Sequence, residues 1–184
     1  MGSFLTRYSS ALLPVWFCWL FQGVAWAQER PVFLDPNWHF VQRDMLFEIR
    51  KYDEVTNGCW RNTQTSVDRV SLELVRSQAS IVEVQLRAAT VVITALGYEI
   101  NSTNCAVTVR TEVYAPHRVD ASVDGYPITA VFPSLLWEQT AILTGPKRTM
   151  SGRVAETHTK HIRKFLIELS QKARELRTTA LGTR

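Results

Sequence analysis

The sequence predicts a single α+β domain, in which an antiparallel sheet of about four strands is packed by N-terminal helices and one long C-terminal amphipathic helix. Three observations support this class. Before residue 78, apolar residues recur at helical spacing. Segments rich in β-branched residues or with alternating polarity follow, and helical spacing returns at the end of the chain. The 184 residues are 46% hydrophobic and 21% charged, which fits one globular domain and excludes a disordered or fibrous chain.

Segment 1–27 has the pattern of a secretory signal peptide. Its one charge, Arg7, is followed by an apolar run and by a small-x-small pattern that ends at Ala27. A transmembrane anchor is the alternative, but it would need about 20 apolar residues, and Pro14 interrupts a shorter run. Cleavage after Ala27 leaves 28–184 as the single domain. We therefore expect a protein of the periplasm or one that is secreted, with no transmembrane span after signal cleavage.

Two cysteines, Cys59 and Cys105, remain in the predicted mature chain. An exported chain with an even number of cysteines is expected to pair them. Such a bond closes a loop of about 47 residues and contributes roughly 4 kcal/mol in the chain-entropy model. A free-thiol nucleophile is the alternative, although no histidine lies near either cysteine in sequence.

Two helices are expected in the first part of the domain. The first begins at Asp35-Pro36, an acidic cap followed by proline, and extends to about Lys51. Within this range, residues 45–49 could instead form a short strand. The second begins near Thr65 or Ser66, after a turn that precedes Cys59.

The middle of the chain predicts strands. Cys105 to Tyr114 alternates most clearly and places Cys105 on the buried face, as expected for a half-covered antiparallel sheet. Ala115-Pro116 is expected to end that strand, and Asp124-Gly125 to form a turn. The other expected strands are Ile81 to Leu86, Thr90 to Ile100, Tyr126 to Phe132 and Leu135 to Leu143.

The last element is a long helix from about Ser151 to Arg177. At 100° per residue, its apolar residues fall within about 120° of one another, which predicts an amphipathic stripe that packs on the sheet. The members of this stripe are Val154, Ala155, His158, Ile162, Phe165, Leu166, Leu169, Ala173 and Leu176.

The sequence contains no motif that announces catalysis. The patterns G-x-S-x-G, H-E-x-x-H and the P-loop are absent, and no catalytic residue, metal ligand set or cofactor is assigned. His158 and His161 are spaced so that they could share a metal, but a third strong ligand is missing and packing is the favoured interpretation. A hydrolase site would require folding to bring His39 or His117 next to a serine or a carboxylate.

Charge is distributed unevenly. Residues 147–184 carry ten basic and three acidic side chains, whereas 28–146 carry ten basic and fourteen acidic ones. A basic face on the last helix favours an anionic envelope component or another envelope protein as partner, and the predicted compartment disfavours nucleic acid. The candidate contact residues are Lys160, Arg163, Lys164, Ile167 and Trp137.

These observations favour an exported periplasmic protein that is not an enzyme, a binding or envelope-assembly accessory module. The alternatives are a small secreted hydrolase with a site assembled from distant residues, and a secreted inhibitor or effector. Asn101-Ser102-Thr103 would be a glycosylation sequon in a eukaryote, but sixteen arginines against five lysines and a compact signal favour a bacterium. The specific ligand and the oligomeric state stay open.

Overall fold

The computed structural model describes residues 37–55 and 58–182, which all lie within one compact unit, 33–184. The predicted signal segment lies outside the described residues, so its cleavage stays a prediction. The described elements, in chain order, are α1 (Asn37–Asp44), β1 (Leu46–Val55), α2 (Thr63–Arg76), β2 (Ser80–Ile81), β3 (Ala89–Asn101), β4 (Asn104–Val123), β5 (Tyr126–Pro146) and α3 (Lys147–Gly182).

The predicted α+β class is confirmed, but the sheet is mixed and not purely antiparallel. Its five strands are ordered β2-β1-β3-β4-β5. Strand β1 runs parallel to both β2 and β3, while β3, β4 and β5 form an antiparallel meander. Both parallel pairs arise because α2 follows β1 and returns the chain to the same end of the sheet, where β2 and then β3 begin.

The first predicted helix is too long, because the chain leaves the helix at Met45. α1 ends at Asp44, and Met45 has a left-handed backbone with φ of 47°, which is incompatible with a continuing helix. The alternative of a strand over 45–49 is therefore nearer the structure, where β1 extends to Val55. Helix α2 is confirmed, with Asn62 as its cap: the Asn62 carboxamide oxygen accepts from the Thr65 amide at 3.1 Å.

Strand Ile81 to Leu86 was overestimated, since β2 contains only two residues and the side chains of Val84 and Leu86 are exposed. Strands β4 and β5 are longer than predicted. Pro116 and Pro133 lie opposite each other inside one continuous ladder. Pro116 is accommodated because β3 ends its pairing with β4 at Tyr114, which leaves the outer edge of β4 without a described partner beyond that point. Pro133 is accommodated because β5 is the edge strand of the described sheet.

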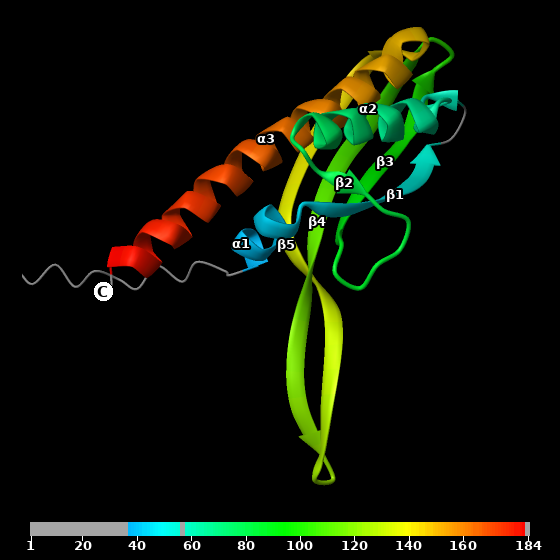
Figure 1. Cartoon of the computed structure of the whole chain (residues 1–184). Coiled ribbons are helices and arrows are strands. Elements are labelled where there is room, and N and C mark those ends of the chain that lie inside the picture. The colour runs from blue at the N-terminus through cyan, green and yellow to red at the C-terminus, as the bar shows by residue number, and fades with distance from the viewer. Residues whose placement is uncertain (1–36, 56–57, 183–184) are drawn as a thin grey trace, which may run out of the picture. The chain divides into compact units, whose positions relative to one another are not determined.

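The three helices cover one face of the sheet (Figure 1). α3 packs its buried stripe against β4, β5, α1 and α2, as its periodicity predicted. The core residues form two clusters on this face, one around Phe47, Leu74, Ile93 and Phe165, the other around the cysteines, Val107, Met150 and Val154. No helix in the described part of the chain has the apolar length that a membrane crossing requires.

None of the helices that the structure describes packs against the opposite face of the sheet (Figure 1). This face carries the side chains that alternate along the strands with the core residues. Among them are Tyr52, Leu96, Tyr98 and Ile142, each of which is at least 42% exposed. The predicted disulfide is present: Cys59 and Cys105 are bonded, fully buried, and 6.0 Å apart between Cα atoms.

Candidate functional site

A buried polar cluster lies between α3 and β4. The Thr111 hydroxyl oxygen is 2.9 Å from His158 Nδ1 and 3.1 Å from His161 Nδ1. A hydroxyl can donate only one proton, so Thr111 donates to one ring and accepts an N–H from the other. Two neutral imidazoles of opposite tautomer satisfy this arrangement. The ring of Trp60 packs against His158, with centroids 5.9 Å apart.

Burial keeps both rings uncharged. Burial, with a smaller contribution from the neighbouring His161, lowers the pKa of His158 from its ordinary 6.5 to about 3. Burial likewise lowers the pKa of His161 to about 4, with a further contribution from Lys164. Although Thr111 and His158 have the spacing of a nucleophile and a base, both are fully buried. A substrate cannot reach this pair in the folded state, so the cluster is suited to packing rather than to catalysis.

His117 lies apart from this cluster. His117 is exposed on the β4–β5 hairpin, and the side chain of His39 lies outside the described residues. Within the described residues, no group of three or more histidine, cysteine, aspartate or glutamate side chains has the arrangement of a metal site.

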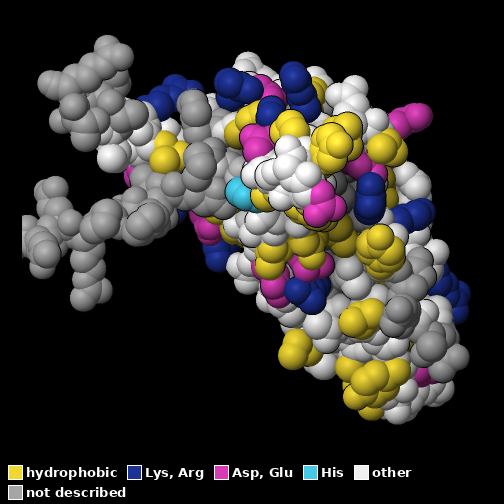
Figure 2. Space-filling model, turned by 90° about the horizontal axis from the view of Figure 1, so that it is seen from below, with side chains coloured by type: hydrophobic (Ala, Val, Ile, Leu, Met, Phe, Trp, Pro, Cys, Tyr) yellow, Lys and Arg dark blue, Asp and Glu magenta, His cyan; other side chains and the backbone are white. Residues whose placement is uncertain are grey.

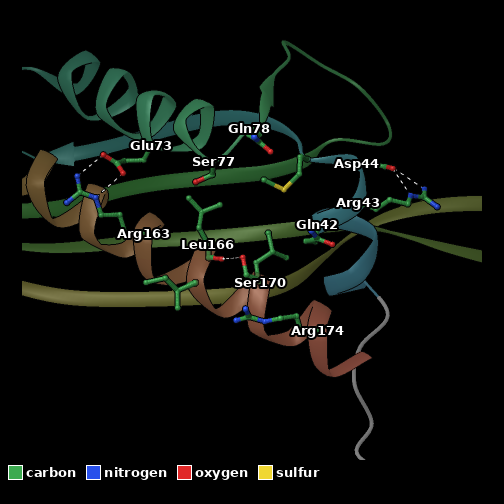
Figure 3. A pocket seen from close by; sticks show the side chains of 13 residues that line it. Gln42, Arg43, Asp44, Glu73, Ser77, Gln78, Arg163, Leu166, Ser170 and Arg174 are labelled. Atoms are coloured by element: carbon green, nitrogen blue, oxygen red, sulfur yellow. Dashed lines mark hydrogen bonds and ion pairs between the residues drawn. The ribbon is translucent and has the colours of Figure 1, made fainter. Parts of the chain in front are cut away.

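A groove of about 790 Å³ lies where the ends of α1 and α2 meet the middle of α3. Figure 3 shows its lining side chains, with Leu166 at its centre and charged groups along its rim. Arg163 binds Glu73 with two hydrogen bonds, of 2.9 and 2.7 Å. These bonds, followed by the charges of Arg163 and Arg76, lower the pKa of Glu73. The groove is therefore amphipathic, but the Arg163–Glu73 ion pair at its rim is already internally satisfied.

The three predicted basic contact residues all have partners in the protein. Lys160 pairs with Glu156 at 2.8 Å, Arg163 pairs with Glu73, and Lys164 donates to Gln139 at 2.8 Å. Two of these three charges are thus neutralised within the protein, and Lys164 has a neutral hydrogen-bond partner. The sequence could not reveal the pairing of Arg163, because Glu73 comes from another element.

We expect Arg163→Gln to lower the melting temperature more than Lys160→Gln does. Arg163 holds a carboxylate whose side chain is only 11% exposed, whereas Lys160 and Glu156 are both largely solvated. An exposed pair contributes little, so Lys160→Gln should stay within about 1–2 °C of the wild type. Thermal unfolding of the two variants compares them directly, and equal melting temperatures would show that the Arg163–Glu73 pair is not structural.

The two predicted apolar contact residues differ in position. Ile167 is 59% exposed and lines the groove. Trp137 is 7% exposed, packs against Phe165 with ring centroids 5.6 Å apart, and donates its indole N–H to Glu168 at 2.9 Å. Trp137 therefore contributes to the core and offers almost no surface to a partner.

The most exposed part of the sheet is the end of the β4–β5 hairpin, Pro116–Pro133, which we call the arm. It extends away from the helices (Figure 1). Its two-residue turn, Asp124-Gly125, has φ angles of 52° and 82°, as a tight hairpin turn requires. The paired residues on one face of the arm are His117 and Phe132, Val119 and Ala130, Ala121 and Ile128, and Val123 and Tyr126.

This apolar arm face continues the core face of the sheet. Residues alternate between faces along a strand, so Val119 and Val123 share a face with Val109 and Val113, which are fully buried beneath the helices. A register shift near Tyr114 keeps the β5 partners on the same face. No described helix covers this face along the arm. Tyr126 is 74% exposed, and Figure 2, seen from below, shows hydrophobic side chains at the surface.

The other face of the arm is mixed, with four polar residues, Arg118, Asp120, Ser122 and Thr129, beside three prolines and Val131. Arg118 binds Asp120 at 3.1 Å, and the Thr129 hydroxyl donates to the same carboxylate. The Thr129 and Arg118 hydrogen bonds lower the pKa of Asp120. The signal for the arm was present in the sequence as alternation on both sides of Asp124-Gly125, but Pro116 was interpreted as the end of a strand.

Comparisons with known proteins do not assign this chain to a family. No family model matches the sequence, and no curated protein matches it either. Among solved structures, the chain is similar to the crystal structure of the rare lipoprotein B from Shewanella oneidensis, with 9% sequence identity and a TM-score of 0.38, over 71% of this chain and 98% of that one. A likeness of this size assigns no function, so the residues of this chain have to supply it.

Proposed function

We propose that this chain is an exported accessory protein of the cell envelope, not an enzyme, that binds another envelope protein through its arm. The observation that carries the proposal is the continuation of the apolar core face into Pro116–Pro133, beyond the cover of the described helices. The Cys59–Cys105 bond supports an oxidising compartment, such as the periplasm or the extracellular space.

The arm has the properties of a segment that a partner completes. An isolated two-stranded ribbon is marginally stable in water, because it lacks a third strand or a helix to bury its apolar face. No strand in the described part of the chain pairs with either outer edge of the arm, since β3 stops pairing with β4 at Tyr114 and β5 is the last strand in the sheet order. A partner protein can bury the apolar face and add a strand to an edge.

Charge favours an apolar contact over an ionic one at the arm. Its side chains include one arginine, Arg118, and two aspartates, Asp120 and Asp124. Arg118 and Asp120 neutralise each other. Ile167, with Lys160 and Lys164 beside it on α3, is proposed as a second and weaker contact surface.

We expect removal of the arm to abolish partner capture while the domain still folds. Ala115 and Ser134 are directly paired, so an Asn-Gly turn can join them in place of 116–133. The assay is in-cell crosslinking of the C-terminally tagged protein, followed by mass spectrometry of what is recovered. One defined envelope protein should be recovered with the wild type and be lost with the shortened chain.

Two point variants separate the apolar face from the arm as a whole. Ile128→Glu places a charge on the apolar face, and Ser122→Glu places the same charge on the opposite face, beside the polar side chains of Asp120 and Thr129. Partner recovery should fall with Ile128→Glu and persist with Ser122→Glu. If the partner is still recovered both with Ile128→Glu and with the shortened chain, the proposal is wrong. Melting temperatures of the two point variants that match the wild type show that a loss of recovery does not come from unfolding.

A further inference from the structure

A second pocket, of about 640 Å³, lies at the opposite end of β4 from the arm. It is formed by the loop after β1, the β3–β4 turn and the start of α3. Its volume is within the range of small-molecule sites, about 300–1,000 Å³. The lining residues used below are Arg61, Ser102, Thr103, Lys147, Arg148 and Ser151.

Three cationic side chains converge on this pocket from two segments that are distant in sequence. Lys147 is partly neutralised by Glu99, at 3.1 Å. Arg61 and Arg148 are exposed, and neither guanidinium has a hydrogen-bond or ion-pair partner among the side chains that the structure describes, which do not include those of Asp53 and Glu54. This distinguishes them from Lys160 and Arg163 on the basic face of α3, which are paired.

The pocket walls are held together before any ligand arrives. The Arg61 amide donates to the Ser151 hydroxyl at 3.0 Å, and the Lys147 amide donates to the Thr103 carbonyl at 2.8 Å. The Cys59–Cys105 disulfide joins the loop that carries Arg61 to the strand that follows Thr103. Three segments are therefore fixed to one another, and ordering them adds little cost to binding.

Glycine also determines where the Arg61 guanidinium lies. Gly58 has φ of 71°, and a Cβ atom at that position would be 2.5 Å from Arg61 Nε. The side chain of Arg61 thus lies across a residue without a side chain. Any larger residue at 58 would displace the guanidinium from the pocket wall.

The placement of these cations is unfavourable without an anion. The first turn of α3 contains Lys147 and Arg148 and no acidic residue. Carboxylates are favoured in the first turn of a helix, and cations are disfavoured there, because of the partial positive charge of the helix end. Arg61 adds a third positive charge. A dianion in the pocket would remove this repulsion, and the hydroxyls of Ser102 and Ser151 line the pocket as further donors.

We infer that this pocket binds the phosphate group of a small phosphorylated molecule or of a lipid headgroup. Guanidinium groups bind phosphate oxygens with charge-assisted, often bidentate, hydrogen bonds, which suits Arg61 and Arg148. The inference is independent of the arm, because the two surfaces share no residue.

The test is NMR titration of the disulfide-bonded protein with inorganic phosphate and with glycerol phosphate, at constant ionic strength set by chloride. Amide resonances of Thr103, Arg148 and Ser151 should shift saturably. Arg61→Gln and Arg148→Gln should each weaken binding about tenfold, the usual effect of one lost charged hydrogen bond. Arg118→Gln on the arm is the matched control and should bind like the wild type.

Vesicle cosedimentation distinguishes the two sources of phosphate. Binding to phosphatidylcholine vesicles only when phosphatidic acid is present, and its loss in Arg61→Gln and Arg148→Gln, would identify a lipid headgroup. Saturable shifts with the soluble phosphates alone would identify a free ligand. If neither probe binds, or if both arginine variants bind like Arg118→Gln while keeping the wild-type melting temperature, the inference is wrong.

Discussion

Reduction of the Cys59–Cys105 disulfide is expected to lower the free energy of unfolding by about 4 kcal/mol. The two cysteines are 46 residues apart in sequence, so the bond removes much of the freedom of the unfolded chain. Both side chains are fully buried beside Val107 and Val154, which means that reduction also leaves two thiols in a tightly packed core cluster. Urea unfolding with and without reductant measures the difference.

A double variant, Cys59→Ala with Cys105→Ala, serves as the control. It should be destabilised to a similar extent, and reductant should not change it further. Intact mass after alkylation should show no free thiol among these two cysteines until the protein is reduced. A urea midpoint that does not respond to reductant in the wild type would contradict the prediction. The bond also joins two walls of the pocket that contains Arg61 and Arg148, so reduction should weaken the proposed phosphate binding as well.

Acidification from pH 7 to pH 5 is expected to destabilise the protein by about 2 kcal/mol for each of His158 and His161. Their folded pKa values are lowered to about 3 and about 4, whereas the unfolded chain binds protons near 6.5. The unfolded state therefore takes up protons first as the pH falls. The contribution of the two neutral rings to the free energy of unfolding is fully present above pH 6.5 and declines below it. It stops changing once the pH has fallen below the folded pKa values.

The interval from pH 7 to pH 5 separates the histidines from the carboxylates. Glu73 has an ordinary pKa of 4.5 that Arg163 lowers further, so it titrates below this interval. Urea midpoints at the two pH values measure the effect. His161→Gln should remove about half of the pH dependence, whereas His117→Gln, on the exposed arm, should leave it unchanged. A midpoint that is constant between pH 7 and pH 5 would disprove the buried, neutral state of both rings.

Much of the fold was predictable because it follows from local patterns. The α3 stripe, the alternation of β4 from Cys105 to Tyr114 and the α2 periodicity each depend on one segment burying one face. The disulfide followed from compartment and cysteine number. Helix α1 was overextended, since a left-handed residue such as Met45 leaves no trace in hydrophobic spacing.

The direction of the strands and the proposed contact surfaces were harder to predict from the sequence. The same alternating pattern fits a parallel or an antiparallel neighbour, so only the packing of α2 across the sheet decides that β1 is parallel to β3. Pro116 ends a strand in most contexts, and only the early end of the β3 ladder makes it acceptable within β4.

The sequence by itself determined the fold class, the disulfide pair and the helix that closes the core, because each depends on periodicity or on residue type. Only the tertiary structure decided which charges are free. Glu73 neutralises Arg163 from 90 residues away, whereas Arg61 and Arg148 meet in one pocket with no partner among the described side chains. Net charge is a property of composition, but the pairing of charges is a property of distances that exist only in the folded chain.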